Sequence, residues 1–340
     1  MAPPLTRSRP TRTATKLPRE RGGRCFGVIV RIVPRWGPKS ESGSVPIRWR
    51  FGSRAGRPQG QDDAVPTPYE REIMAWRVHR TARLTAPDGW LAVVGLAWLA
   101  EGENTVGSDP SCRVRLPGDD VPGVVGSIIL RGDAATFTAR PGSGVTHQGL
   151  AVAELPLRDD LAGEPTRLRV GSVVFHLIRR YDRLAVRIRD EESPARAAFK
   201  GIDYFPIDRR WRVQARFEPH QPSRVSRVPT VLDKEETYDT PGAVAFEVKG
   251  VSCRLEAFLE PGETDLFIVF GDQTNGSETY GGGRYLYTRQ ADASGLVIVD
   301  FNKAYNPPCV FTPHATCALP LPENRLPVRV EAGEKRYSSM

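Results

Sequence analysis

The sequence has no long hydrophobic run. Its longest apolar stretch, residues 90–100, has eleven residues, whereas a membrane-spanning helix needs about 18 or more. We therefore expect no membrane partner. Cysteine is also scarce, with five scattered positions in 340 residues, which argues against a disulfide scaffold. Widely spaced cysteines without an export signal are typical of reduced thiols, so we expect a cytoplasmic protein.

Glycine and proline are abundant, because they account for 62 of the 340 residues. The hydrophobic fraction of 39% still provides enough apolar side chains for a core in a chain of this length. These two features together predict a loop-rich, β-heavy protein.

Basic residues are concentrated at the N-terminus. Residues 1–66 contain 14 Lys and Arg against four Asp and Glu, whereas residues 67–340 contain 34 against 36. The N-terminal segment is rich in Pro, Gly and Ser and lacks a sustained apolar period, which predicts a disordered basic tail. A basic arm that binds nucleic acid is the alternative. We favour the disordered extension and do not expect nucleic acid as a partner.

One amphipathic helix is predicted directly after the tail. Thr67 and Glu70 have capping-box spacing, and Pro68 occupies the first helical position. The apolar residues near one helical face are Tyr69, Ile73, Trp76 and Leu84. The arginines expected to face solvent are Arg77, Arg80 and Arg83. A turn at residues 87–89 ends the helix.

Short extended segments separated by turn residues make up the rest of the chain. The first series covers residues 114–116, 127–130, 135–138, 167–170, 173–180 and 184–189. The second series covers residues 211–217, 243–248, 253–259, 265–270, 284–288, 296–300 and 328–331. No long helical period recurs, so we predict a mainly β fold of two packed antiparallel lobes, sandwich-like or barrel-like. The predicted division is a tail (1–66), a helix with the first β lobe (67–228) and a second β lobe (229–340).

Two stretches of sequence carry a family resemblance. The motifs of the first stretch are Pro-Asp-Gly-Trp-Leu (87–91), Gly-Leu-Ala-Trp-Leu (95–99) and Glu-Gly-Glu-Asn (101–104). Those of the second are Thr-Tyr-Gly-Gly-Gly-Arg-Tyr-Leu (279–286) and Asp-Phe-Asn-Lys-Ala-Tyr-Asn-Pro-Pro-Cys (300–309). Together they resemble the uncharacterised bacterial and archaeal family DUF1684, from about residue 72 to residue 335. This resemblance implies kinship and no particular activity.

A weaker resemblance concerns residues 100–180. The segments 104–109, 114–117 and 168–171 resemble the strand order of forkhead-associated sandwiches. That family binds phosphothreonine through an Arg after an early Gly and through a Ser-x-x-His segment. Ser108 stands in the Arg position here, and residues 123–128 contain no His. The resemblance therefore implies a similar sandwich without the charge partner for phosphate.

The loop after residues 296–299 is the densest group of polar residues. Asp300, Asn302, Lys303 and Asn306 follow an apolar strand, and two prolines then stiffen the exit. A rigid polar loop at a strand end favours a binding site. The alternative is a structural corner in which the Asp and Asn side chains bond to the local backbone.

A triple glycine precedes Arg284, which follows Tyr280 closely. Glycines let the backbone approach an anion, and an arginine can hold that anion with two donors. A flexible hairpin turn is the alternative. The predicted ligand-binding residues are Tyr280, Arg284, Asp300, Asn302, Lys303 and Asn306, converging on one pocket.

Two further patterns are open to more than one interpretation. A zinc ion could be bound by Cys309, His314 and Cys317, but a fourth ligand is not apparent. We favour the alternative of two small buried thiols beside a solvent-facing His, so no metal is predicted. The arginines predicted to form a solvated sheet surface are Arg179, Arg180, Arg183, Arg187 and Arg189.

These patterns predict a protein that binds a small molecule or anion in a polar pocket of the C-terminal lobe. Whether it is an enzyme stays open, and no cofactor is predicted. The alternative function is a protein–protein interaction module built on the forkhead-associated-like sandwich. A deep pocket at the polar residues favours the first function, whereas an exposed apolar patch or a phosphate-binding loop on the sandwich favours the second.

Overall fold

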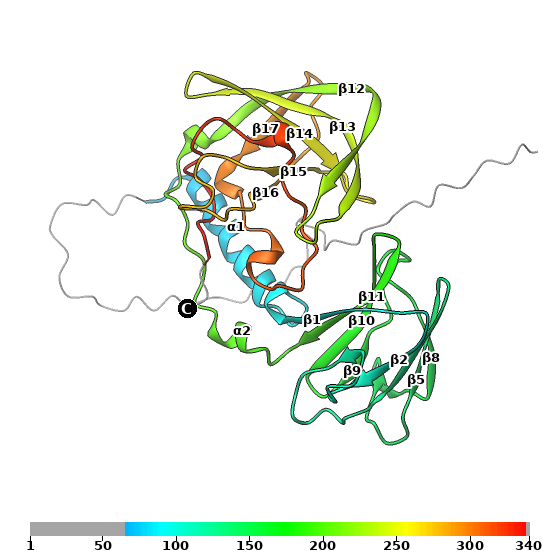
Figure 1. Cartoon of the computed structure of the whole chain (residues 1–340). Helices are drawn as coiled ribbons and strands as arrows, with labels where there is room; N and C mark the ends of the chain where they lie inside the picture. Colours follow the sequence, from blue (N-terminus) through cyan, green and yellow to red (C-terminus); the bar gives the residue numbers. More distant parts are fainter. Residues whose placement is uncertain (1–64, 338–340) are drawn as a thin grey trace, which may run out of the picture.

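The structure of the chain is a computed structural model that describes residues 65–337. Two β lobes lie one above the other, and one long helix runs along the second lobe to the junction between them (Figure 1). The predicted mainly β fold with one leading helix is confirmed. The predicted basic tail lies outside the described residues, apart from Val65 and Pro66.

The N-terminal lobe is a sandwich of two sheets. The strands of the first sheet are β1 (Val93–Trp98), β6 (Thr146–His147), β7 (Leu150–Ala151), β9 (Leu168–Val170), β10 (Val173–Arg180) and β11 (Arg183–Asp190). Those of the second are β2 (Gly102–Gly107), β3 (Val114–Arg115), β4 (Gly126–Arg131), β5 (Ala134–Ala139) and β8 (Glu154–Leu157). The strand orders are β1-β11-β10-β9-β6-β7 and β3-β2-β4-β5-β8.

Side-chain alternation gives the first sheet of the sandwich two different faces. Phe175 of β10 points into the core, where its ring meets Phe137 of the opposite sheet at 5.9 Å between centroids. The next residue, His176, points to the other face, as does its register partner Arg187 of β11. This outer face therefore carries polar and charged side chains, and it is turned toward the C-terminal lobe.

The C-terminal lobe is built on one six-stranded sheet. Its strands are β12 (Arg212–Pro229), β13 (Glu235–Val248), β14 (Val251–Leu259), β15 (Leu266–Phe270), β16 (Arg284–Thr288) and β17 (Leu296–Asp300), in the order β16-β15-β14-β13-β12-β17. All five residues of β15 are buried. Ile268 packs on one face with Trp211, and Phe267 packs on the other with Tyr285. Both faces of this sheet are therefore covered.

Two α-helices and five short 3-10 helices complete the described part. They are α1 (Pro68–Thr85), α2 (Pro194–Ala198), η1 (Trp90–Ala92), η2 (Arg209–Trp211), η3 (Phe301–Lys303), η4 (Pro308–Val310) and η5 (Pro322–Asn324). No helix within residues 65–337 has both the length and the apolar character that crossing a membrane requires.

Helix α1 begins as its sequence predicts. The Thr67 hydroxyl accepts the N–H of Glu70, and the Glu70 carboxylate accepts the N–H of Thr67, which completes the capping box. The helix packs on the C-terminal lobe, although it precedes the sandwich in the chain. The prediction that Arg80 faces solvent was wrong: its guanidinium is buried and donates to Glu334 at 2.8 Å and to the Asn306 carbonyl at 2.9 Å.

Three predicted elements differ from the structure. Residues 102–107, which lie outside the predicted extended segments, form strand β2, in which Asn104 is buried and its amide bonds to the Ala100 backbone. Residues 328–331 form no strand: the Val330 carbonyl accepts from the Arg284 side chain, and the Val330 N–H donates to the Asp272 carboxylate. The sequence division ended the first lobe at residue 228, but β12 pairs with β13 and β17 of the second sheet.

We expect Glu334→Gln to lower the free energy of unfolding by about 3–5 kcal/mol, measured by urea denaturation. The reason is that it breaks the buried ion pair between Glu334 and the Arg80 guanidinium by removing the charge of one partner. The control is Glu72→Gln on the same helix, which removes the surface pair with Lys303 and is expected to change stability by less than about 1 kcal/mol. Similar losses in the two variants would contradict the role of the buried pair.

Candidate functional site

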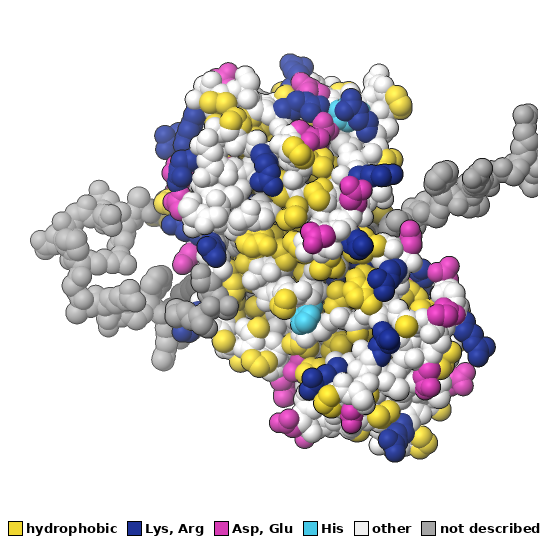
Figure 2. Space-filling view, viewed as in Figure 1, with side chains coloured by type: hydrophobic (Ala, Val, Ile, Leu, Met, Phe, Trp, Pro, Cys, Tyr) yellow, Lys and Arg dark blue, Asp and Glu magenta, His cyan; other side chains and the backbone are white. Residues whose placement is uncertain are grey.

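A cavity of about 360 Å³ lies between the two lobes. Its lining comes from α1, from η1, from the outer face of β10 and β11, and from β15 and β16. Figure 2 shows hydrophobic side chains gathered across the middle of the molecule, where the lobes meet. The arginines in the lining are Arg80, Arg83, Arg167, Arg180, Arg187 and Arg189. The carboxylates are Asp88, Asp160, Glu164 and Glu260, so positive charge is in excess.

Three of these arginines form what we term the guanidinium wall: Arg180, Arg187 and Arg189. They share one sheet face because Arg187 and Arg189 are two residues apart in β11, and Arg180 lies on the same side of β10. Arg180 is held by a two-pronged pair with Asp160, at 3.1 and 2.8 Å. Arg187 is buried and lies over the ring of Trp90, 5.0 Å from its centroid.

Arg189 has a different environment from the other two. It forms no ion pair with a carboxylate among residues 65–337, and its Nε has no hydrogen-bond partner there. Its nearest polar contact is His176, whose ring nitrogens lie 3.4 Å from Nη1. Burial, and then repulsion by Arg167, lowers the pKa of Arg189 to about 10. Asp88 and Asp160 act on Arg189 from a distance and oppose this lowering, but no carboxylate of residues 65–337 forms an ion pair with it.

His176 is neutral at pH 7 because of this surrounding. Burial is the largest cause of its pKa falling well below the usual value, and repulsion by Arg189, Arg187, Arg167 and Arg180 adds to it. A neutral imidazole has one unprotonated nitrogen, which accepts a hydrogen bond from Arg189. The imidazole thus fills space between guanidinium groups without adding charge.

The solvated-surface prediction for the arginine series was wrong for this wall. Arg180 and Arg187 are only 8% and 5% exposed. Arg183, in contrast, is exposed and lies over the ring of Trp98. The alternating residues of β10 and β11 predict which side chains share a face of the sheet. The local sequence does not show that the C-terminal lobe covers this face.

Aromatic residues of the C-terminal lobe form the opposite side of the cavity, which we term the ring wall: Phe267, Tyr285, Tyr287 and Tyr305. Phe267 and Tyr287 are register partners whose ring centroids are 5.0 Å apart. Tyr305 is nearly parallel to Tyr287, with 10° between the planes and 6.3 Å between centroids. The Tyr287 hydroxyl donates to the buried Glu260 carboxylate at 2.5 Å.

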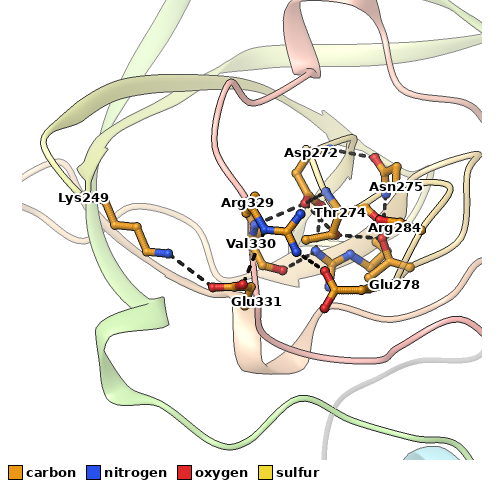
Figure 3. A network of polar contacts seen from close by, with 11 residues as sticks. Lys249, Asp272, Thr274, Asn275, Glu278, Arg284, Arg329, Val330 and Glu331 are labelled. Atoms are coloured by element: carbon orange, nitrogen blue, oxygen red, sulfur yellow. Dashed lines mark hydrogen bonds and ion pairs between the residues drawn. The ribbon is translucent and has the colours of Figure 1, made fainter.

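The sequence-predicted site residues do not line this cavity, nor the groove of about 740 Å³ beside Trp211. Arg284 is completely buried. It pairs with Asp272 at 2.7 Å and donates to the carbonyls of Ala332 and Val330 (Figure 3). Its donors thus join three segments of the C-terminal lobe, and the glycine before it has φ +88°, as a turn requires.

Asp300 and Asn302 do come together, around the helix. The Tyr69 hydroxyl of α1 donates to Asp300 at 2.8 Å and accepts from the Asn302 amide at 2.9 Å. Burial, and then the charge of Asp300, raises the pKa of Tyr69, which keeps the hydroxyl protonated. Asn302 also bonds to both backbone groups of Asp208. Only one bond is of the local kind that the structural-corner alternative describes, from the Asn302 N–H to the Asp300 carboxylate at 3.2 Å.

Lys303, Asn306 and Tyr280 lie in separate places. Lys303 pairs with Glu72 at the surface, and the Asn306 amide donates to the Lys335 carbonyl at 2.8 Å. The Tyr280 hydroxyl lies 3.6 Å from the Cys309 sulfur. Among the six predicted residues, only Asp300 and Asn302 bond to each other through their side chains.

The cysteines Cys309 and Cys317 are neighbours, and both are free thiols. The Cys309 N–H donates to the Cys317 sulfur at 3.1 Å, and Cys317 also lines the cavity. A hydrogen bond from Cys317 lowers the pKa of Cys309, whereas burial raises that of Cys317. Within residues 65–337, no group of three or more His, Cys, Asp or Glu side chains is placed to hold a metal ion, so His314 does not complete a site with them.

We expect His176 to make the protein less stable as the pH falls. An unfolded histidine titrates near 6.5 and the folded one lower, so below about 6.5 the unfolded state binds the extra proton and stability is lost. One pH unit below the pKa of an unfolded histidine, the loss is at most about 1.4 kcal/mol. Urea denaturation of the wild type and of His176→Gln at pH 7.5 and 5.5 measures this loss of stability. A stability difference between them that does not change with pH would contradict this assignment.

One family model matches the C-terminal part of the chain. The family described as "Protein of unknown function (DUF1684)" matches residues 197–335. The chain is also similar to an uncharacterised protein of Haloarcula marismortui, solved by NMR in solution, with 32% sequence identity, 41% of this chain and 78% of that chain covered, and a TM-score of 0.36. None of the curated proteins matches. The wider resemblance predicted from residue 72 onward stays a prediction before residue 197, and the chain belongs to the DUF1684 family.

Proposed function

We propose that this protein binds an anionic small molecule in the cavity between its lobes. The observation that carries the proposal is the Arg189 guanidinium, half-buried beside Arg187 and His176 and without an ion pair to any carboxylate of residues 65–337. A charge withdrawn from water without a partner is unfavourable by several kcal/mol. A bound anion supplies the missing partner.

The donor chemistry of the guanidinium wall suits a carboxylate or a phosphate group. Each guanidinium presents several N–H donors in one plane, and two such groups on one sheet face can hold an anion from two directions. The pair between Arg180 and Asp160 fixes one edge of the wall. The ligand class agrees with the sequence-based prediction of a small molecule or anion, but the proposed place is the junction of the lobes instead of the polar loop at Asp300.

The alternative function, a protein-interaction module on the sandwich, has less support. Among the exposed large hydrophobic residues of the described part, Leu150 is the single one in the sandwich, so no apolar patch forms there. The Ser108 hydroxyl donates to the Val121 carbonyl at 2.7 Å. The position that carries an arginine in forkhead-associated domains therefore supports the loop here.

Titration calorimetry with inorganic phosphate at low ionic strength tests the proposal. We expect the wild type to bind and Arg189→Gln to bind about tenfold or more weakly, because a hydrogen bond to a charged group contributes about 1.5–3 kcal/mol. The control is Arg183→Gln, on the same strand but exposed, which should retain the wild-type affinity within twofold. No binding by the wild type, or equal binding by Arg189→Gln, would contradict the proposal.

Thermal unfolding without phosphate adds an independent check on the same variant. Arg189→Gln removes the repulsion between Arg189 and its neighbours Arg167 and Arg83, and it breaks no ion pair with the described residues. It should therefore be at least as stable as the wild type, as expected of a residue kept for binding. Lower stability of the variant would instead indicate a structural role.

A further inference from the structure

We infer that the ligand of this cavity is an aromatic acid, with a planar ring joined to a phosphate or carboxylate group. The inference rests on the proposed function and adds the chemical class of the uncharged part of the ligand. It comes from the ring wall, which lines the same cavity from the opposite lobe.

The ring wall is a cluster of packed aromatic rings, in which the Tyr285 ring stands nearly perpendicular to those of Phe267 and Tyr305, at 87° to each. Tyr287 is half-buried, and Phe267, at 5.0 Å between centroids, and the nearly parallel Tyr305, at 6.3 Å, pack against it. Its hydroxyl is fixed by the buried Glu260 carboxylate at 2.5 Å. A ring held in this way loses little conformational entropy when another ring packs on it, which favours offset stacking.

Charge and rings also meet at two points of the cavity lining. Arg187 lies over the Trp90 ring, and Arg80 of α1 lies over the Tyr305 ring at 4.7 Å. A planar ligand ring lying between the two walls can contact both aromatic faces and guanidinium planes. Neither an inorganic anion nor an uncharged ring can use both walls.

The volume of the cavity sets an upper limit on the ligand. At about 360 Å³ it lies near the lower end of the range for small-molecule sites, about 300–1,000 Å³. One ring with one acidic group fits this volume. A polymer or a dinucleotide does not.

The test compares two phosphate monoesters that differ in their uncharged part: methyl phosphate and phenyl phosphate. Titration calorimetry on the full chain should give a phenyl phosphate affinity about tenfold or more above that of methyl phosphate. Tyr287→Leu should reduce this ratio to less than about threefold. Tyr287→Phe, which loses the hydroxyl but keeps the ring, should retain it and so controls for the lost bond to Glu260.

The outcomes separate the two proposals. Equal affinity for both esters in the wild type overturns the aromatic inference and leaves anion binding in place. If Tyr287→Leu retains the wild-type ratio of phenyl phosphate to methyl phosphate affinity, the ring wall is not where the ligand ring binds. Failure of the wild type to bind either ester contradicts the proposed function, and the inference that rests on it.

Discussion

The buried ion pair between Arg80 and Glu334 fixes on the C-terminal lobe the helix that leads into the sandwich. It fastens helix α1 to the last segment of the C-terminal lobe, and both carboxylate oxygens of Glu334 are used, on Arg80 and on the Asn306 N–H. The chain then passes from α1 through η1 directly into β1, the edge strand that pairs with β11 of the sandwich. One helix docked on the second lobe thus positions the arginines of the first. Arg80 itself lines the cavity.

The interface between the lobes explains why charged residues alternate with apolar ones along β10 and β11. The inner face of β10 and β11 forms the sandwich core, so only the outer face is free to carry a binding function. Covering this face with the C-terminal lobe removes Arg187 and His176 from water, which strengthens their interaction with any anion that enters. The unfavourable burial of like charges is offset in part by Asp160 and by the neutral state of His176.

Local features were predictable from the sequence, and long-range partners were not. The capping box at Thr67 and the strands at residues 173–180, 284–288 and 296–300 depend on neighbours in the chain, and the structure agrees with them. The role of Arg284 depends on Asp272 and on carbonyls more than 40 residues away. The cavity was missed for the same reason. Its one local signal was the alternation of Arg187 and Arg189 on a strand whose other face is apolar.

A crystal structure of the full chain grown with phenyl phosphate tests the account most directly. We expect the phosphate within hydrogen-bond distance of the Arg189 guanidinium and the phenyl ring packed on Tyr287, with the lobes in the arrangement described above. A phenyl phosphate molecule bound elsewhere on the protein, with the cavity between the lobes holding only water, would contradict the account.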